Sequence, residues 1–458
     1  MNTPERPYGS GVIPGRRHFL TRTLGALGCL QVGSDRRTFG ETPCPSVEVT
    51  PQPLRRGTLS KQGKTFLGEY RPKLSTRDFQ LLSLSVETLE SNILTPTDEH
   101  PGPLPWYPKR GICPSPFRYR GVWSWDSAFH AVGAVRFDPV LAREQLSILL
   151  DHQLPSGALC DVIFEDGSKV TSFGKPPVLP WAAEIVDRAA PDDAFLRVLY
   201  PKCVMHETHW CSNRRDNTEK LFHFDSGNPD PERRRSEARM EAGWDNSVRW
   251  DEASNDWWAI DLNCNMVMLY RSLAYMAARL GNHEDQQRWV GRAEALGAEI
   301  NRVLYDEATG AYLDRHRHTG KFGRALTPAS FLPLYVRIAS PEQAKRLAAL
   351  AADPGKFYPT VPSVSYDHPE FNPLDYWRGP SWLNIAYFML KGLQFYGYRD
   401  TADRCREWLL NACSGYSLWE YYRSRGPSAG TGLGAPQYGW TAVFVMEFLL
   451  NWSPESQH

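Results

Sequence analysis

The sequence predicts an all-α protein folded as an (α/α)6 toroid, a closed ring of six helical hairpins, with short loop and β-hairpin insertions. Apolar residues recur at three- to four-residue spacing in twelve segments, enough for six hairpins. Strand-like alternation is confined to short stretches near 160–165 and 311–315. No short repeat period is visible, which disfavours a helical solenoid. The predicted helices are 79–94, 125–135, 138–152, 177–189, 192–211, 259–280, 284–305, 327–335, 341–352, 380–397, 399–412 and 438–451.

Residue types at the ends of these segments support their boundaries. Asp138-Pro139 and Ser340-Pro341 each place a capping side chain before a proline at the first helical position. Gly281 and Gly397 stand where C-terminal caps are expected. Short links between consecutive helices, as after 259–280, predict αα-hairpins.

The N-terminal part differs in composition from the rest of the chain. The arginine pair Arg16-Arg17 precedes a weakly apolar stretch at 24–33, an arrangement typical of a twin-arginine export signal. We therefore expect a signal segment at 1–33, a Pro-, Arg- and Thr-rich linker or arm at 34–77, and the (α/α)6 domain at 78–458. A functional signal predicts a periplasmic or secreted protein, and a non-functional one predicts a cytoplasmic protein.

Charge and composition exclude several classes of protein. The 52 basic and 52 acidic side chains balance, which argues against binding to nucleic acid by phosphate neutralisation. The sequence contains no run of 18 apolar residues, so no membrane span is predicted. The nine cysteines contain no C-x-x-C pair or zinc-ligand spacing, and no metal or cofactor is expected. The polar segment 212–240, which contains Arg233–Arg235, is predicted to be a solvated loop.

Four segments combine tryptophan with carboxylates and arginine. The sixteen tryptophans fit either a bulky core or a surface that stacks on sugar rings, and composition alone does not decide between them. Indole faces stack on the C–H faces of sugars, while carboxylates and arginine bind their hydroxyls. This repeated combination favours a carbohydrate site. The segments are YRGVWSWDSAF at 119–129, EAGWDNSVRWD at 241–251, DYWRGPSW at 375–382, and LWEYY at 418–422 with the glycine-rich 429–440.

Two carboxyl groups are the best candidates for glycoside hydrolysis. This reaction needs one group to protonate the leaving oxygen and another to activate water or attack. Asp245 follows Trp244, and Glu420 lies between Trp419 and Tyr421, so both have aromatic neighbours that can raise a carboxyl pKa by burial. Spacing alone does not separate them from the competing carboxyls Asp126, Asp251, Asp261 and Glu241.

The four segments together resemble glycoside hydrolase family 63 and related (α/α)6 glycosidases, and particularly the short bacterial mannosylglycerate and glucosylglycerate hydrolases. The resemblance runs from Tyr119 to Leu450 through W-x-W-D, G-W-D-N-S-x-R-W, Y-W-R-G-P-x-W, W-E-Y-Y and a closing G-W-T. It implies an (α/α)6 barrel and inverting hydrolysis of an α-glucosyl or α-mannosyl substrate. It places the general acid on Asp245 and the general base on Glu420.

The resemblance also implies a set of substrate contacts and a substrate class. The implied partner is an oligosaccharide or a small glycosyl-glycerate, and Gly432–Gly434 resembles a mobile loop that covers substrate. The polarity pattern of the predicted helix faces does not indicate an oligomeric state. The predicted contacts are Tyr119, Trp123, Trp125, Asp126, Gly243, Trp244, Tyr376, Trp377, Arg378 and Trp440.

Two features depart from the family pattern, and two alternative functions stay open. Lys175 precedes a proline pair where the glycerate hydrolases carry glutamine, and it can meet an anionic aglycone or mark a different one. An export signal is unexpected for an enzyme of cytosolic solutes and favours an extracellular glycan. The alternatives are a polysaccharide lyase, although the four segments contain no histidine, and a non-catalytic sugar-binding protein, which has no need of both carboxylates.

Overall fold

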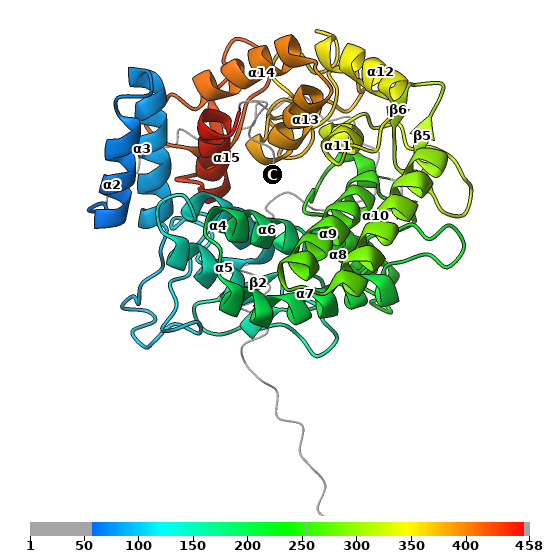
Figure 1. Ribbon diagram of the computed structural model, residues 1–458. Helices are drawn as coiled ribbons and strands as arrows, with labels where there is room; N and C mark the ends of the chain where they lie inside the picture. The colour runs from blue at the N-terminus through cyan, green and yellow to red at the C-terminus, as the bar shows by residue number, and fades with distance from the viewer. Residues whose placement is uncertain (1–56, 252–254, 453–458) are drawn as a thin grey trace, which may run out of the picture. The chain divides into compact units, whose positions relative to one another are not determined.

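Six helices form a closed inner ring in the computed structural model, which describes residues 57–251 and 255–452. Each ring helix contacts the next, and α15 contacts α4, so the end of the chain closes the ring against its first member (Figure 1). The ring helices are α4 (Ser124–Ala134), α6 (Leu179–Ala189), α9 (Ile260–Arg279), α11 (Leu332–Tyr335), α13 (Leu383–Phe395) and α15 (Gly439–Leu450).

Six further helices alternate with these along the chain and cover them from outside. All eleven residues of α4 are buried, whereas α10 buries only a stripe of six among its 21 residues. A helix that is apolar all round belongs inside, and an amphipathic one belongs at the surface. The predicted all-α (α/α)6 toroid is thus confirmed. The outer helices are α3 (Thr76–Ser91), α5 (Pro139–Asp151), α7 (Asp193–Asn213), α10 (His283–Val303), α12 (Pro341–Ala352) and α14 (Arg399–Ala412).

All twelve predicted helices are present in the described part of the chain, and two more there were missed. The segment 327–335 begins as a 3₁₀ turn, η2 (Pro328–Phe331), before α11. The helix α2 (Lys61–Tyr70) lies in the predicted linker and packs on α3. The helix α8 (Pro231–Ala242) lies in the predicted polar loop and contains the arginine run, so that loop prediction was wrong. Asp230 caps α8 by accepting from the backbone of Glu232 and Arg233.

The strands are short and antiparallel, and they decorate the loops between helices. Strands near 160–165 and 311–315 are confirmed as members of small hairpins. The pairs are β1 (Gly121–Trp123) with β2 (Val162–Phe164) and β2 with β3 (Lys169–Val170), β4 (Trp257–Trp258) with β7 (Arg315–His316), β5 (Tyr305–Asp306) with β6 (Ala311–Tyr312), and β8 (Trp419–Tyr422) with β9 (Gly432–Pro436).

The tryptophan-rich segments all lie ahead of ring helices. They precede or open α4, α9, α13 and α15. Because every ring helix follows an outer helix that runs the opposite way, the N-termini of the ring helices share one end of the toroid. The positive ends of these helix dipoles point toward the same region, which favours the negative charge of carboxylates there. The fold therefore gathers segments far apart in sequence at one end of the ring.

The predicted division into signal segment, linker and helical domain stays a prediction. The chain divides into two units at Pro53/Leu54, and every described residue belongs to the second unit. The predicted signal at 1–33 and most of the predicted linker lie outside the described residues. None of the helices within 57–251 and 255–452 combines the length and apolar character needed to cross a bilayer. The seven cysteines in these ranges are free thiols, and six are buried.

The contact between α4 and α15 predicts a specific sensitivity of stability. A Cβ on Gly133 of α4 would lie 2.8 Å from Val443 Cγ2 and 3.0 Å from Leu89 Cδ1, so no side chain fits there. We expect Gly133→Leu to lower the free energy of unfolding by about 3 kcal/mol through overpacking, measured by urea denaturation. As a control, Gly291→Leu on α10, where no atom lies within 4 Å, should be neutral or raise it by up to about 1 kcal/mol. Equal effects at both positions would contradict the closure of the ring by close packing.

Candidate functional site

Glu420 is fully buried and held by three donors from three loops. The hydroxyls of Tyr376 and Tyr119 donate to Oε1 at 2.9 and 3.1 Å, and the backbone N–H of Ala435 donates to Oε2 at 3.0 Å. Burial raises the pKa of Glu420 to about 7, while these hydrogen bonds favour the charged form. The carboxyl therefore changes its protonation state near neutral pH.

The hairpin that carries Glu420 is shaped around it. The β8–β9 register shifts between Trp419 and Tyr421, which places a bulge at Glu420. Across the hairpin, Gly434 has a φ of +76°, and a Cβ there would lie 2.5 Å from Glu420 Oε2. Glycine is thus required at this position both by backbone conformation and by the space the carboxylate needs.

Asp245 stands on the loop that follows α8. Gly243 ends α8 in the left-handed region with a φ of +74°, and a Cβ there would meet Trp125 Cη2 at 2.6 Å. Asp245 is partly buried, and its buried Oδ1 has no hydrogen-bond partner among the described residues. Burial raises the pKa of Asp245, and the charge of Lys175 opposes this rise. The environment therefore favours a protonated carboxyl with one oxygen available.

Asn246 joins the Asp245 loop to the loop ahead of α13. Its Nδ2 donates to Asp375 Oδ1 at 2.8 Å, and its Oδ1 accepts from the backbone N–H of Trp377 at 2.9 Å. Arg378 donates to both carboxylate oxygens of Asp251, at 2.8 and 2.9 Å, and to the backbone oxygen of Asn246 at 3.2 Å. The side chain of Arg378, a predicted sugar contact, thus binds the loop that follows α8.

Arg249 fixes the same loop from the other side. Its buried guanidinium pairs with Asp261 at 2.7 Å and with Asp314 at 2.8 Å. Its centre lies 5.1 Å from the Trp244 ring centroid and 4.4 Å from that of Trp250, close enough for cation–π attraction. The loop between α8 and α9 is therefore anchored immediately beside Asp245.

Ion pairs with arginine distinguish most of the competing carboxyls from Asp245 and Glu420. Asp251 and Asp261 are committed to the arginines just described, and Glu241 pairs with Arg214 at 2.8 Å. Among the competitors, Asp126 remains: it is 3% exposed, and its Oδ1 has no hydrogen-bond partner in the described chain. Burial raises the pKa of Asp126 well above its usual range. Asp126 therefore belongs with the site rather than with the structural ion pairs.

A column of aromatic rings walls the site. Trp377 and Trp382 stack with centroids 3.8 Å apart and planes 5° from parallel. Trp244 lies 5.1 Å from Trp377 at a tilt of 33°, and Tyr421 stacks on Trp382 at 4.6 Å. Trp382 and Tyr421 were in the quoted segments but not among the predicted contacts. The stack joins three loops into one rigid wall.

The remaining predicted contacts lie around this wall. Trp125 packs edge-on against Trp440 at 5.4 Å, and the Trp440 indole N–H donates to the Glu420 backbone oxygen at 3.4 Å. Trp123 is partly exposed and packs edge-on against Tyr119 at 5.6 Å. Tyr376 holds a left-handed φ of 28°, a strained conformation typical of functional positions.

Electrostatic contacts place the two candidate carboxyls in one site. Both Glu420 and Asp245 raise the pKa of Tyr376, and both also raise that of Tyr438, although burial is the larger cause for each tyrosine. Tyr438 was not predicted, and only its place in the closing segment before Trp440 hinted at it. Within the described ranges, no group of three His, Cys, Asp or Glu side chains can hold a metal ion.

Lys175 and Asp161 complete the acidic end of the site. Lys175 is 8% exposed and Asp161 is 5% exposed, and Lys175 Nζ lies 3.4 Å from Asp161 Oδ1. Burial raises the pKa of Asp161 to about 6. Asp161 was missed because it stands in a hairpin far in sequence from the four segments.

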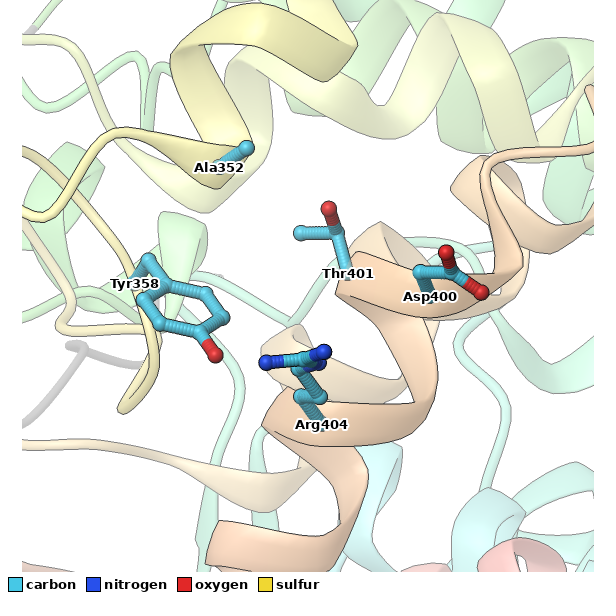
Figure 2. A pocket seen from close by; sticks show the side chains of 5 residues that line it. All are labelled: Ala352, Tyr358, Asp400, Thr401 and Arg404. Atoms are coloured by element: carbon cyan, nitrogen blue, oxygen red, sulfur yellow. The ribbon is translucent and has the colours of Figure 1, made fainter.

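A surface hollow of about 240 Å³ lies apart from these residues. Figure 2 shows Asp400, Thr401 and Arg404 of α14 opposite Ala352 of α12 and the ring of Tyr358. These residues belong to outer helices and to the connection after α12, and none lies in the four tryptophan-rich segments. The hollow is therefore separate from the candidate catalytic groups.

The sequence of residues 119–441 matches the family described as "Mannosylglycerate hydrolase MGH1-like glycoside hydrolase domain". The chain belongs to this family. The match covers well over half of the 458 residues and includes all four tryptophan-rich segments. It confirms the predicted resemblance and the predicted activity class, an inverting α-glycoside hydrolase. It disfavours the alternatives of a lyase and of a non-catalytic binder.

Relatives of this glycoside hydrolase span most of its length. The mannosylglycerate hydrolase of Rubrobacter radiotolerans is 28% identical over 74% of this chain and 92% of its own. The glucosylglycerate hydrolase of Mycolicibacterium hassiacum is 24% identical over 73% of this chain and 93% of its own. The crystal structure of the family 63 mannosylglycerate hydrolase of Thermus thermophilus with Tris and D-glycerate is 23% identical and covers 80% of this chain and 99% of its own, with a TM-score of 0.66, which supports the fold.

Proposed function

We propose that this enzyme cleaves an α-mannosyl or α-glucosyl bond to a small polar aglycone such as glycerate, with Asp245 as general acid and Glu420 as general base. One observation carries the assignment of roles. Two buried or partly buried carboxyls stand on different loops of one aromatic-walled site, one held by three donors and the other with a buried oxygen that has no partner among the described residues. Inverting hydrolysis needs such a pair in opposite protonation states.

The base role fits the hydrogen bonds of Glu420. Tyr119, Tyr376 and the Ala435 N–H all donate to the carboxylate and so stabilise its charged form. With a pKa of about 7, which burial sets, the carboxyl is mainly ionised above that pH. A carboxylate has about four acceptor sites, so the three donors leave room for a water molecule. The ionised carboxylate takes a proton from that water as its oxygen attacks the anomeric carbon.

The acid role fits the surroundings of Asp245. Burial raises the pKa of Asp245 and so widens the pH range over which its carboxyl is protonated, and Oδ1 carries no competing hydrogen bond from the described residues. The proton passes to the glycosidic oxygen as the bond to the anomeric carbon breaks. Water attacks from the opposite face, so an α-glycoside releases a β-sugar.

The substrate class rests on the aromatic wall and on the relatives. Trp377 and Trp382 stack on each other within the wall, whereas the ring of Trp123 is partly exposed and meets Tyr119 edge-on. Asp126 has an oxygen without a partner in the described chain that suits a sugar hydroxyl. The relatives named above act on mannosylglycerate and glucosylglycerate, and one Thermus structure contains glucose. These facts support a short glycoside over a polymer.

We also propose that residues 1–33 direct export to the periplasm or the medium. The support is the Arg16-Arg17 pair followed by the apolar stretch 24–33. An exported enzyme would meet its glycoside outside the cytoplasm.

The catalytic pair predicts a product and a pattern of mutant activities. Proton NMR should show the β-anomer as first product from mannosylglycerate or glucosylglycerate, in a panel that includes trehalose, kojibiose, nigerose and an α-mannobiose. Asp245→Asn and Glu420→Gln should each lower kcat by about 1,000-fold or more without changing the melting temperature by more than a few degrees. An α-glycosyl fluoride, whose leaving group needs little protonation, should restore turnover by Asp245→Asn but not by Glu420→Gln.

Three results would contradict these roles. An α-anomer as first product would mean retention. Full activity of either variant on the natural glycoside would remove that residue from the pair. Rescue of Glu420→Gln by the fluoride with none for Asp245→Asn would exchange the two roles. Asp251→Asn is the control, because Asp251 is paired with Arg378 outside the acid–base pair and should retain turnover.

The hydrogen bonds to Glu420 predict the acidic limb of the pH profile. Because the base must be ionised, kcat/KM should rise with pH through about 7, the pKa to which burial raises Glu420. Tyr376→Phe removes a donor to the charged form, so the pKa should increase and the limb should move upward by about one pH unit. Tyr387→Phe, which removes a buried hydroxyl bonded to Glu447 at 3.2 Å, is the matched control and should leave the limb unmoved. A limb that stays in place or moves downward in Tyr376→Phe would exclude Glu420 as the ionising group.

The export proposal predicts a change of compartment. Replacing Arg16 and Arg17 together by lysine keeps the charge but removes the paired guanidinium groups. We expect the full-length variant to remain in the cytoplasm while the unaltered chain is exported, measured by cell fractionation and immunoblotting. Equal export of both chains would refute a twin-arginine signal.

A further inference from the structure

We propose that Lys175 is a positioning residue for the general acid, which fixes the Asp245 loop from the end of α8 and places a positive charge beside it. This inference rests on the proposed acid role of Asp245. It concerns a residue outside the four tryptophan-rich segments.

The position of Lys175 links two elements that lead to the acid. Its Nζ donates to the backbone oxygen of Met240, in the last turn of α8. The same oxygen accepts from the N–H of Gly243 at 3.1 Å, the bond that closes the left-handed exit from α8. Two residues later the chain reaches Asp245. The lysine therefore holds the turn from which the acid projects.

The charge of Lys175 balances an acidic cluster. It lowers the pKa of Asp126, Asp161 and Asp245, and the three carboxylates in turn raise the pKa of Lys175, although burial is the larger cause for each group. Besides Lys175, Asp161, Tyr376 and Tyr438 of the described residues also interact electrostatically with Asp245. Lys175 thus places a positive charge beside Asp245.

This charge has a consequence for proton transfer. A general acid works best when its pKa lies near the operating pH, since a carboxyl with a much higher pKa gives up its proton less readily. Burial alone drives the pKa of Asp245 upward, and the ammonium of Lys175 limits that rise. Loss of Lys175 should therefore leave Asp245 protonated over a wider pH range but as a weaker acid.

The test compares variants of Lys175 in the full chain. Lys175→Met removes both the charge and the donor, and Lys175→Gln removes the charge while keeping a donor for the Met240 oxygen. Lys391→Met is the matched control, because Lys391 is also buried and donates to a backbone oxygen, that of Asn451 at 2.7 Å, in the core of α13 and α15. Values of kcat and KM are measured across pH on mannosylglycerate, glucosylglycerate and a neutral α-glycoside, together with melting temperatures.

We expect the basic limb of kcat/KM to move upward by about one pH unit in both Lys175 variants. We expect kcat at the optimum to fall by about tenfold in Lys175→Met and by less in Lys175→Gln, which retains the anchor to α8. The Lys391→Met variant should lose thermal stability and keep the wild-type pH profile. If Lys175→Met does not fold, Lys175→Gln alone still tests the shift of the limb.

Two outcomes would overturn the inference. A lower melting temperature with an unmoved basic limb would mean that Lys175 is only structural. An unmoved limb with a KM raised for the glycerates and unchanged for the neutral glycoside would mean that Lys175 binds the aglycone. Either result with an inactive, fluoride-rescued Asp245→Asn leaves the proposed function intact, whereas full activity of Asp245→Asn refutes that function itself.

Discussion

The stacked rings of Trp377 and Trp382 are the contact on which the site depends. Their planes lie 5° from parallel at 3.8 Å, and they connect through Trp244 and Tyr421 to the loops that carry Asp245 and Glu420. Each of these segments connects helices of the ring. The aromatic column and the bonds of Asn246 turn separate connections into a rigid unit. Such preorganisation is what acid–base chemistry requires.

The closed ring explains why residues so far apart in sequence share one environment. Contact between α15 and α4 brings the last segment of the chain beside the first, so Tyr119 reaches Glu420. The same packing removes water from the carboxyls of Asp245 and Glu420. Burial, and not a neighbouring anion, is the leading cause of their raised pKa values. The fold thus creates the chemistry of the site by excluding solvent at the end of a ring of apolar helices.

Periodicity predicted the fold well because ring helices and outer helices carry strong apolar patterns. The helix α8 was missed because its sequence, PERRRSEARMEA, is almost entirely polar, and its capping signals at Asp230 and Pro231 went unused. The helix α2 was missed because a Pro- and Arg-rich segment surrounds it. In the site, motifs pointed to Asp245 and Glu420, but spacing left Asp251, Asp261 and Glu241 as equals. Only their arginine partners, which depend on three-dimensional contacts, separate them.

The protonation state of Glu420 depends on the position of the β8–β9 hairpin that carries it. The Ala435 N–H belongs to the same hairpin and travels with the carboxylate, whereas the two tyrosine hydroxyls come from loops ahead of α4 and α13. If the hairpin shifts while Glu420 stays buried, Glu420 loses two of its three donors, burial still raises its pKa, and its charged form becomes less stable. Glu420 displaced within the buried site would therefore be protonated more readily and could not act as a base. Ionisation in this enzyme is thus conditional on assembly, so that a reactive carboxylate exists only where its three loops meet.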